Sequence, residues 1–149
     1  MIELKRTNSK NADFDYLNKL LDKELVIRDG DEHAFFAQFN KIDTINHVIV
    51  AYQNNEPLGC GAFKKYDEET AEIKRMFVLP EGRGKKIASK VLAELEHWAK
   101  ELGYKNCILE TGATFKDAVG LYKNANYAVI PNYGQYKEVA NSMCFSKSL

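Results

Sequence analysis

The pattern of apolar and polar positions changes period several times along the chain. Residues 2–7 alternate between apolar and polar side chains, which is typical of a half-buried strand. From residue 11 to residue 30 the apolar positions recur every three or four residues, which predicts an amphipathic helix. We expect Asn11 or Asp13 to cap the start of this helix, and Gly30 to end the turn after it.

Strand patterns dominate the middle of the chain, after a second and shorter helix that is predicted over residues 31–42. Residues 47–52 and 57–66 flank a turn rich in Asn, Pro and Gly, and therefore predict a hairpin. An acidic turn at residues 67–69 leads into a third, longer strand over residues 70–79.

The helical period returns after Pro80. Apolar side chains then follow at spacings of four, four, three and four residues, which predicts one buried helix face closed by a left-handed Gly103. That face consists of Ile87, Val91, Leu95, Trp98 and Leu102. The remaining patterns predict a strand over 106–111, a short helix over 115–125, and strands over 127–133 and 139–147.

The order of these elements predicts a fold of the mixed α/β (α+β) class. A meander of strands precedes strands that alternate with helices, so we expect a central mixed sheet of about seven strands with helices on both faces. The length of 149 residues suits one domain over residues 1–149, since no repeat or long linker divides the chain.

Composition narrows the function classes. The chain has 21 Lys plus Arg and 21 Asp plus Glu, so a general polyanion binder is disfavoured and no nucleic-acid partner is expected. The polar first ten residues and the lack of a long apolar stretch predict neither a leader nor a membrane partner, and hence a cytoplasmic protein. The three Cys are predicted to be free buried thiols, and the three His lack metal-ligand spacing, so no metal is expected.

One short stretch carries candidate chemistry: "VLPEGRGKKIASKVL", residues 78–92, places a basic glycine turn between a strand and a helix. The first amides of a helix lack internal partners and carry the positive end of the helix dipole, so such a turn can bind an anion. A basic loop with glycine caps is the simpler alternative. The turn matches neither the Walker nor the Rossmann pattern.

Three segments in order resemble the GNAT superfamily of acetyl-CoA-dependent N-acetyltransferases. "RGKKIA" resembles the Arg/Gln-x-x-Gly-x-Gly/Ala signature, "AEIKRMFVLPE" is similar to the long central strand before it, and "AVGLYKNANY" resembles a later segment ending in Gly-Phe/Tyr. The resemblance covers about residues 46–131. It implies the GNAT-like fold, and acetyl-CoA as co-substrate. It also implies a pyrophosphate held by the backbone amides of Arg83, Gly84, Lys85, Lys86, Ile87 and Ala88.

The chain departs from the family pattern at three positions. Lys86 stands where the family usually has Gly; the helix-start amide is kept if Lys86 has a negative φ, and its ammonium could meet a phosphate. Asn126 replaces a later Gly and is expected to keep the left-handed cap. Phe115 stands near the place of a common Asn, which would remove one cofactor contact.

The resemblance also implies catalytic roles. Tyr122 would face the cofactor sulfur as general acid; a core tyrosine is the alternative. Glu72 matches the general base of some histone-type members, and the alternative is a solvated residue or a partner of Lys74 or Arg75. The Met76 N–H would polarise the acetyl carbonyl.

The resemblance places the substrate contacts on two segments. Phe77 and Val78 would lie along the pantetheine arm of the cofactor. Tyr133 and Tyr136, in the "PNYGQY" loop, would line the acceptor side, unless that segment is a simple hairpin turn.

Taken with the chemistry of the turn, these segments predict an N-acetyltransferase that moves an acetyl group to a primary amine by direct attack in a ternary complex. The amine could belong to a small molecule or a peptide, and a homodimer is compatible with the pattern. A non-catalytic acyl-CoA-binding or sensor domain on the same fold is the alternative. A nucleotide-binding protein is disfavoured, because the Walker Ser/Thr is missing.

Overall fold

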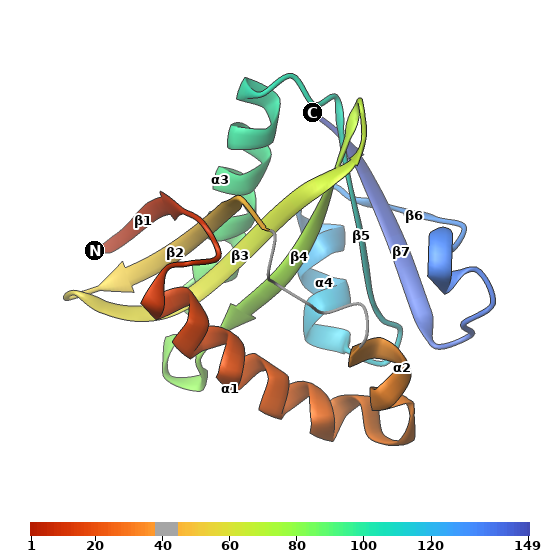
Figure 1. Ribbon diagram of the computed structural model, residues 1–149, viewed down its shortest axis with the longest axis horizontal. Coiled ribbons are helices and arrows are strands. Elements are labelled where there is room, and N and C mark those ends of the chain that lie inside the picture. The colour runs from red at the N-terminus through yellow and green to blue at the C-terminus, as the bar shows by residue number, and fades with distance from the viewer. Residues whose placement is uncertain (38–44) are drawn as a thin grey trace.

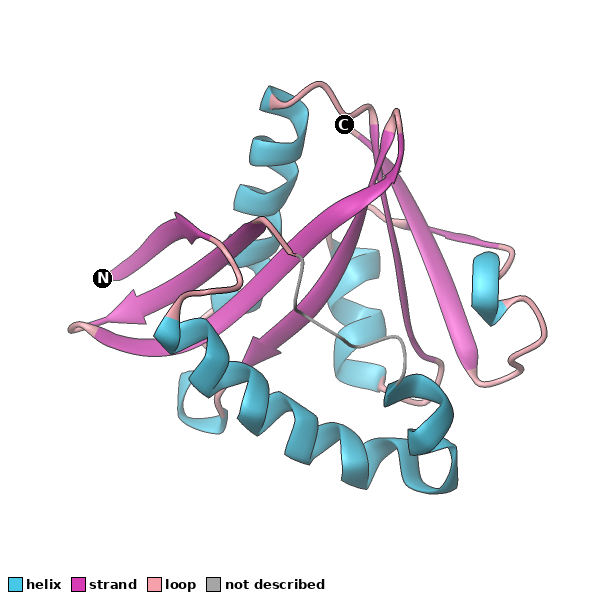
Figure 2. Ribbon diagram, in the orientation of Figure 1, coloured by secondary structure: helices cyan, strands magenta, loops and turns pink. Residues whose placement is uncertain are grey.

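The computed structural model describes residues 1–37 and 45–149, which form one seven-stranded sheet with helices packed against it (Figures 1 and 2). The strands are β1 (Ile2–Thr7), β2 (His47–Gln53), β3 (Glu56–Asp67), β4 (Thr70–Val78), β5 (Asn106–Gly112), β6 (Ala128–Ile130) and β7 (Ser142–Ser148). The α-helices are α1 (Ala12–Asp29), α2 (His33–Ala37), α3 (Ile87–Glu101) and α4 (Lys116–Asn124), and the 3-10 turns are η1 (Gly30–Glu32), η2 (Pro80–Gly82) and η3 (Gly134–Tyr136).

The sheet order is β1-β2-β3-β4-β5-β7-β6, and among these neighbours only β4 and β5 run parallel. The predicted mixed sheet is therefore confirmed. In Figure 1, α1 crosses the face turned toward the viewer, whereas α3 and α4 lie behind the sheet. No helix in the described part of the chain is long and apolar enough to cross a bilayer.

The two long helices bury the faces that their spacing predicts, with one exception. Helix α1 buries Phe14, Leu17 and Leu21 against the front of the sheet. Helix α3 buries Ile87, Val91, Leu92, Leu95 and Ala99 against the back. Leu102 is 50% exposed, contrary to its predicted place in the core, because α3 ends one residue earlier and Leu102 is the cap.

The helix ends confirm most of the predicted caps. Asn11, and not Asp13, caps α1, because its side chain accepts a hydrogen bond from Phe14 N at 2.9 Å. Gly30 ends the same helix with a φ of 56°, and Gly103 follows α3 with a φ of 98°. Asn126 takes a φ of 72° after α4, so it keeps the left-handed turn that the family's glycine would make.

The carboxyl-terminal strands are shorter than predicted. The strand expected over 127–133 covers only Ala128–Ile130, and β7 begins at Ser142 rather than at residue 139. Pro131 cannot donate to a strand ladder, and the Asn132 side-chain amide donates to Val139 O and Ser142 O at 3.0 and 3.1 Å. The intervening segment is therefore a compact loop.

The second predicted helix is only partly described. Its first part forms η1 and α2, and α2 ends at Ala37. The predicted remainder, residues 38–42, lies outside the described residues.

Strand β4 carries a bulge. In the register with β3, Cys60 pairs with Phe77 whereas Ala62 pairs with Lys74, so two residues of β4 oppose Gly61 alone. One of them, Arg75, has a φ of 60°. A Cβ on Gly61 would lie 2.5 Å from Met76 Sδ, so the Met76 side chain at the bulge packs into the space that the glycine leaves open.

The pairing of β4 with β5 is short. It runs from Thr70↔Asn106 to Glu72↔Ile108, and beyond that point the two strands separate (Figure 1). Since parallel strands that separate leave their facing backbone groups without a neighbouring strand, this gap is the natural place for a ligand. The candidate site therefore lies in the gap between β4 and β5.

Candidate active site

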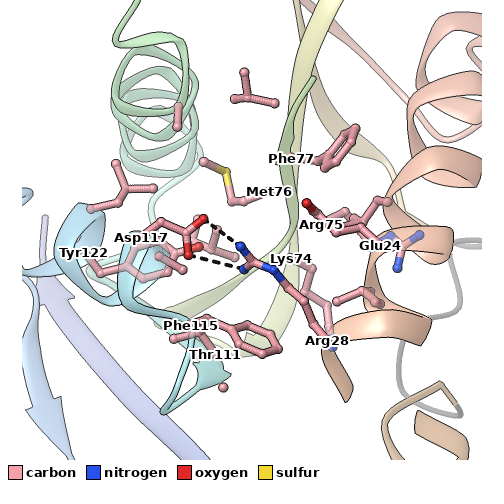
Figure 3. Close-up of a pocket in the computed structure, with 18 of the residues that line it drawn as sticks. Glu24, Arg28, Lys74, Arg75, Met76, Phe77, Thr111, Phe115, Asp117 and Tyr122 are labelled. Carbon is pink, nitrogen blue, oxygen red and sulfur yellow. Dashed lines mark hydrogen bonds and ion pairs between the residues drawn. The ribbon is translucent and has the colours of Figure 1, made fainter. Parts of the chain in front are cut away.

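A cavity of about 490 Å³ opens where β4 and β5 separate (Figure 3). Its walls come from β4, the glycine turn with the first turn of α3, helix α4, the end of β5, and helix α1. Ten of the residues that the sequence analysis proposed lie on these walls: Met76, Phe77, Val78, Arg83, Gly84, Lys86, Ile87, Ala88, Tyr122 and Tyr136. Three others, Glu72, Lys85 and Tyr133, are not part of this lining.

The glycine turn uses two left-handed residues. Gly84 has a φ of 84° and Lys86 a φ of 62°, and α3 begins at the next residue, Ile87. The condition stated for Lys86, a negative φ, is therefore not met. Lysine here adopts the conformation for which the family's glycine is suited, at a cost of about 1–2 kcal/mol, because the chain must turn sharply from strand to helix.

The basic side chains of the turn differ in their surroundings. Arg83 donates from Nε to Val78 O at 3.0 Å and from Nη2 to Glu24 Oε1 at 2.9 Å, which ties the turn to α1. Lys85 donates to Gln53 Oε1 at 2.9 Å, away from the cavity. Arg83 and Lys86 are therefore the cations that the turn brings to the cavity wall.

Tyr122 belongs both to the core and to the cavity. Its ring packs against Tyr127 and Phe145, with centroid distances of 5.9 and 5.8 Å, and the residue is 6% exposed. Burial raises the pKa of the Tyr122 phenol well above its usual range, so the hydroxyl holds its proton at neutral pH. A protonated phenol on the cavity wall can act as a proton donor.

Glu72 is 5% exposed, and its carboxylate contacts two other side chains. Tyr133 Oη donates to Glu72 Oε2 at 2.7 Å, and Lys74 Nζ lies 3.9 Å from the same oxygen. Burial, and then the charge of Glu72, raise the pKa of Tyr133, so Tyr133 is the donor of this bond. The role of Glu72 as general base stays a prediction.

Glu110, a carboxylate on the cavity wall at the end of β5, was not among the site residues predicted from the sequence. Ser142 Oγ donates to Glu110 Oε2 at 2.7 Å. Burial raises the pKa of Glu110 to about 7, although the Ser142 bond and the charge of Lys74 oppose this change. The sequence feature that could have pointed to Glu110 as a site residue is its charge at the end of the otherwise apolar segment "CILE".

An ion pair that joins α1 to α4 was also not predicted from the sequence. Arg28 donates to both oxygens of Asp117 at 3.3 and 3.0 Å, and its guanidinium lies 4.8 Å from the centre of the Phe115 ring (Figure 3). All three residues line the cavity. No spacing rule connects partners that lie 89 positions apart, so only the folded chain shows this pair.

The described residues contain no group of three or more His, Cys, Asp or Glu side chains placed to hold a metal ion. Cys60, Cys107 and Cys144 are buried and free, as predicted.

Comparisons with known proteins agree with this geometry. The model of the "Acetyltransferase (GNAT) family" matches residues 14–127. The uncharacterised N-acetyltransferase YsnE of Bacillus subtilis is 34% identical over 101 residues, which cover 66% of this chain and 67% of YsnE. The aminoalkylphosphonate N-acetyltransferase of Salmonella typhimurium is 30% identical over 132 residues, covering 84% of both chains. A solved structure from Klebsiella pneumoniae, which its name proposes as an acyl-CoA N-acyltransferase, is 26% identical with a TM-score of 0.83, covering 100% of this chain and 98% of that one.

Proposed function

Because the chain belongs to the GNAT family of acetyltransferases, we propose that it transfers an acetyl group from acetyl-CoA to a primary amine by direct attack in a ternary complex. The observation that carries this proposal is the cavity between β4 and β5. Its walls combine a basic glycine turn at the start of a helix, a bulged strand and a buried phenol.

The glycine turn is proposed to bind the pyrophosphate of acetyl-CoA through the amides of residues 83–88. The left-handed Gly84 and Lys86 lead directly into the first turn of α3, where the helix dipole favours an anion. The charges of Arg83 and Lys86 would add to this attraction. Phe77 and Val78 continue the same wall and are proposed to contact the pantetheine arm.

The bulge supports a role for the Met76 amide. Neither Arg75 nor Met76 has a partner residue in the β3–β4 register, so the Met76 N–H lies outside the regular ladder. We place the acetyl carbonyl oxygen at this N–H, where negative charge develops during attack. The amine nitrogen forms a bond to the carbonyl carbon, the carbon–sulfur bond breaks, and the leaving thiolate accepts a proton from Tyr122.

The acceptor is proposed to enter between α1 and the loop after β6. Tyr136 of this loop lines the cavity, and Tyr133 holds Glu72 beside it. The name of the Salmonella relative supports including aminoalkylphosphonates in the acceptor panel, together with polyamines, amino acids, aminoglycosides and peptide amino termini.

The test is an acetyl-CoA assay in which released thiol is measured with each amine of this panel. We expect amine-dependent thiol release that saturates with acetyl-CoA, and Arg83→Glu should weaken acetyl-CoA binding while the circular dichroism spectrum is unchanged. Saturable acetyl-CoA binding without amine-dependent release would favour the non-catalytic sensor. Unchanged affinity in Arg83→Glu would remove the turn from the site.

A further inference from the structure

Glu110 occupies the position at which the sheet opens. The last β4–β5 pair joins Glu72 to Ile108, and Glu110 is two residues further along β5. Because strand side chains alternate, Glu110 faces the same side of the sheet as Ile108 and Glu72. Unlike Glu72, it lies beyond the paired region and on the cavity wall, together with Lys74, Tyr122 and Tyr136.

One oxygen of this carboxyl group is fixed and the other is available. Ser142 on β7 donates to Oε2 at 2.7 Å, a distance typical of a hydroxyl bound to a carboxylate. Oε1 accepts no hydrogen bond from residues 1–37 or 45–149. The serine therefore orients the carboxyl group without using the oxygen that could accept a proton from a ligand.

The surroundings of Glu110 combine burial with several ionisable groups. Burial raises its pKa to about 7, the charges of Asp29 and Glu72 act in the same direction, and Ser142 and Lys74 lower it. Burial also lowers the pKa of Lys74. The other ionisable groups that interact electrostatically with Glu110 are Tyr122, Tyr136 and Cys144.

Glu72 is less suited to proton transfer from a ligand. Its Oε2 accepts the Tyr133 hydroxyl and lies 3.9 Å from Lys74 Nζ, and the residue is outside the cavity lining. Its contacts connect β4 to the loop that carries Tyr133 and Tyr136. A base must reach the proton that it removes, so geometry favours Glu110.

We propose that Glu110 is the general base that deprotonates the acceptor ammonium, and that Ser142 is its positioning residue. This inference rests on the proposed acetyl transfer. The ammonium gives one proton to Glu110 Oε1 and becomes the neutral amine that attacks the thioester carbon. As the carbon–sulfur bond breaks, Tyr122 gives its proton to the leaving thiolate and regains one from the second proton that the nitrogen loses, and Glu110 then releases its own proton to solvent.

The decisive variant is Glu110→Gln, with Glu72→Gln as the matched control. Wild-type kcat/KM should rise with pH through about 7, because the base works when it is deprotonated. Glu110→Gln should lose this rise and lose about 10²–10⁴-fold in kcat/KM at neutral pH, with part of the rate regained at high pH, where free amine is supplied by solution. Its acetyl-CoA affinity, measured by calorimetry, should be unchanged.

Ser142→Ala tests the positioning role through the pH profile. The Ser142 hydrogen bond favours the carboxylate, so its removal should move the inflection of kcat/KM to higher pH. A merely structural serine would lower activity without moving the inflection.

A readout that needs no acceptor is the pH dependence of stability. The pKa of Glu110 in the folded protein, about 7, lies above the ordinary glutamate value of about 4.5, so its contribution to stability is lost as pH rises from about 4.5 to 7. The melting temperature of Glu110→Gln relative to wild type should therefore increase over this window. A flat difference would contradict the proposal.

The outcomes separate the two proposals. A wild-type chain with no amine-dependent thiol release would overturn both. An active wild type with Glu110→Gln of equal rate and pH profile would overturn only the base assignment, and a loss confined to Glu72→Gln would transfer the role to Glu72.

Discussion

Lys86→Gly should make the protein more stable while it weakens acetyl-CoA binding. Lys86 has a φ of 62°, which costs an L-residue about 1–2 kcal/mol relative to glycine. Glycine also makes the unfolded chain more flexible, which lowers the free energy of unfolding by about 0.4–1 kcal/mol. The net gain should be about 0.5–1 kcal/mol, or roughly 1–4 °C in melting temperature for a chain of this size.

The loss of affinity has a separate cause. The exposed Lys86 ammonium lies on the cavity wall and would attract the pyrophosphate, and an exposed ion pair contributes about 0.2–1 kcal/mol. We therefore expect acetyl-CoA to bind up to about five-fold more weakly to Lys86→Gly, with the difference shrinking at high salt.

Two control variants separate conformation from charge. Lys86→Ala removes the ammonium but retains a Cβ at the left-handed position, so it should lose affinity like Lys86→Gly without the gain in stability. Asn126→Gly relieves a second left-handed residue, φ 72°, outside the cavity lining, so it should leave acetyl-CoA affinity unchanged. Urea unfolding and calorimetry measure both quantities. Lys86→Gly with unchanged or lower stability, or tighter binding, would refute the reasoning.

Three further predictions test other parts of the structure. Gly61→Ala should cost about 1–3 kcal/mol in urea unfolding, because its Cβ would lie 2.5 Å from Met76 Sδ and 2.9 Å from Leu95 and Val91; Gly120→Ala, with open space around it, is the control and should not destabilise. Asn11→Ala should cost about 1 kcal/mol through loss of the α1 cap, whereas Asn11→Asp should retain it. Tyr122→Phe should lower kcat about 10²-fold with little change in the KM for acetyl-CoA, and a normal kcat would leave Tyr122 as a packing residue.

The predictable parts of this structure are those set by local physical rules. Periodicity placed α3 and the strand meander correctly, since amphipathic elements must bury one face in any fold. The left-handed positions Gly103 and Asn126 followed from side-chain sterics, which act within a few residues. The glycine turn could be located for the same reason. The family resemblance then supported the expected mixed sheet of about seven strands, without giving the order of the strands.

The unpredicted parts depend on contacts between distant segments. The Ser142–Glu110 bond joins positions 32 apart. The raised pKa of Glu110 comes mainly from burial, which no local pattern reveals. The left-handed φ of Lys86 was not predicted, because it follows from the sharp turn between strand and helix and not from the preference of a lysine residue. The two ends of the loop before β7, residues 131–133 and 139–141, were predicted as strand because the hydrogen bonds of Asn132 with positions seven and ten residues away have no sequence signature.

The bulge in β4 shows how one inserted residue can create the site. Alternation along β4 would place Arg75 behind the sheet, but its φ of 60° turns the side chain to α1, where Asn18 Oδ1 and Asp22 Oδ1 each accept a hydrogen bond at 2.7 Å. These bonds, together with the Cys60 thiol that donates to Arg75 O, offset the strain and fix α1 against β4. Since the bulge also bends and twists the strand, β4 leaves β5 soon after Glu72, and the cavity forms in the gap. The same buried arginine thus holds α1 against β4 at the bulge that takes Met76 out of the β3–β4 register, beside the cavity on whose wall Glu110 lies.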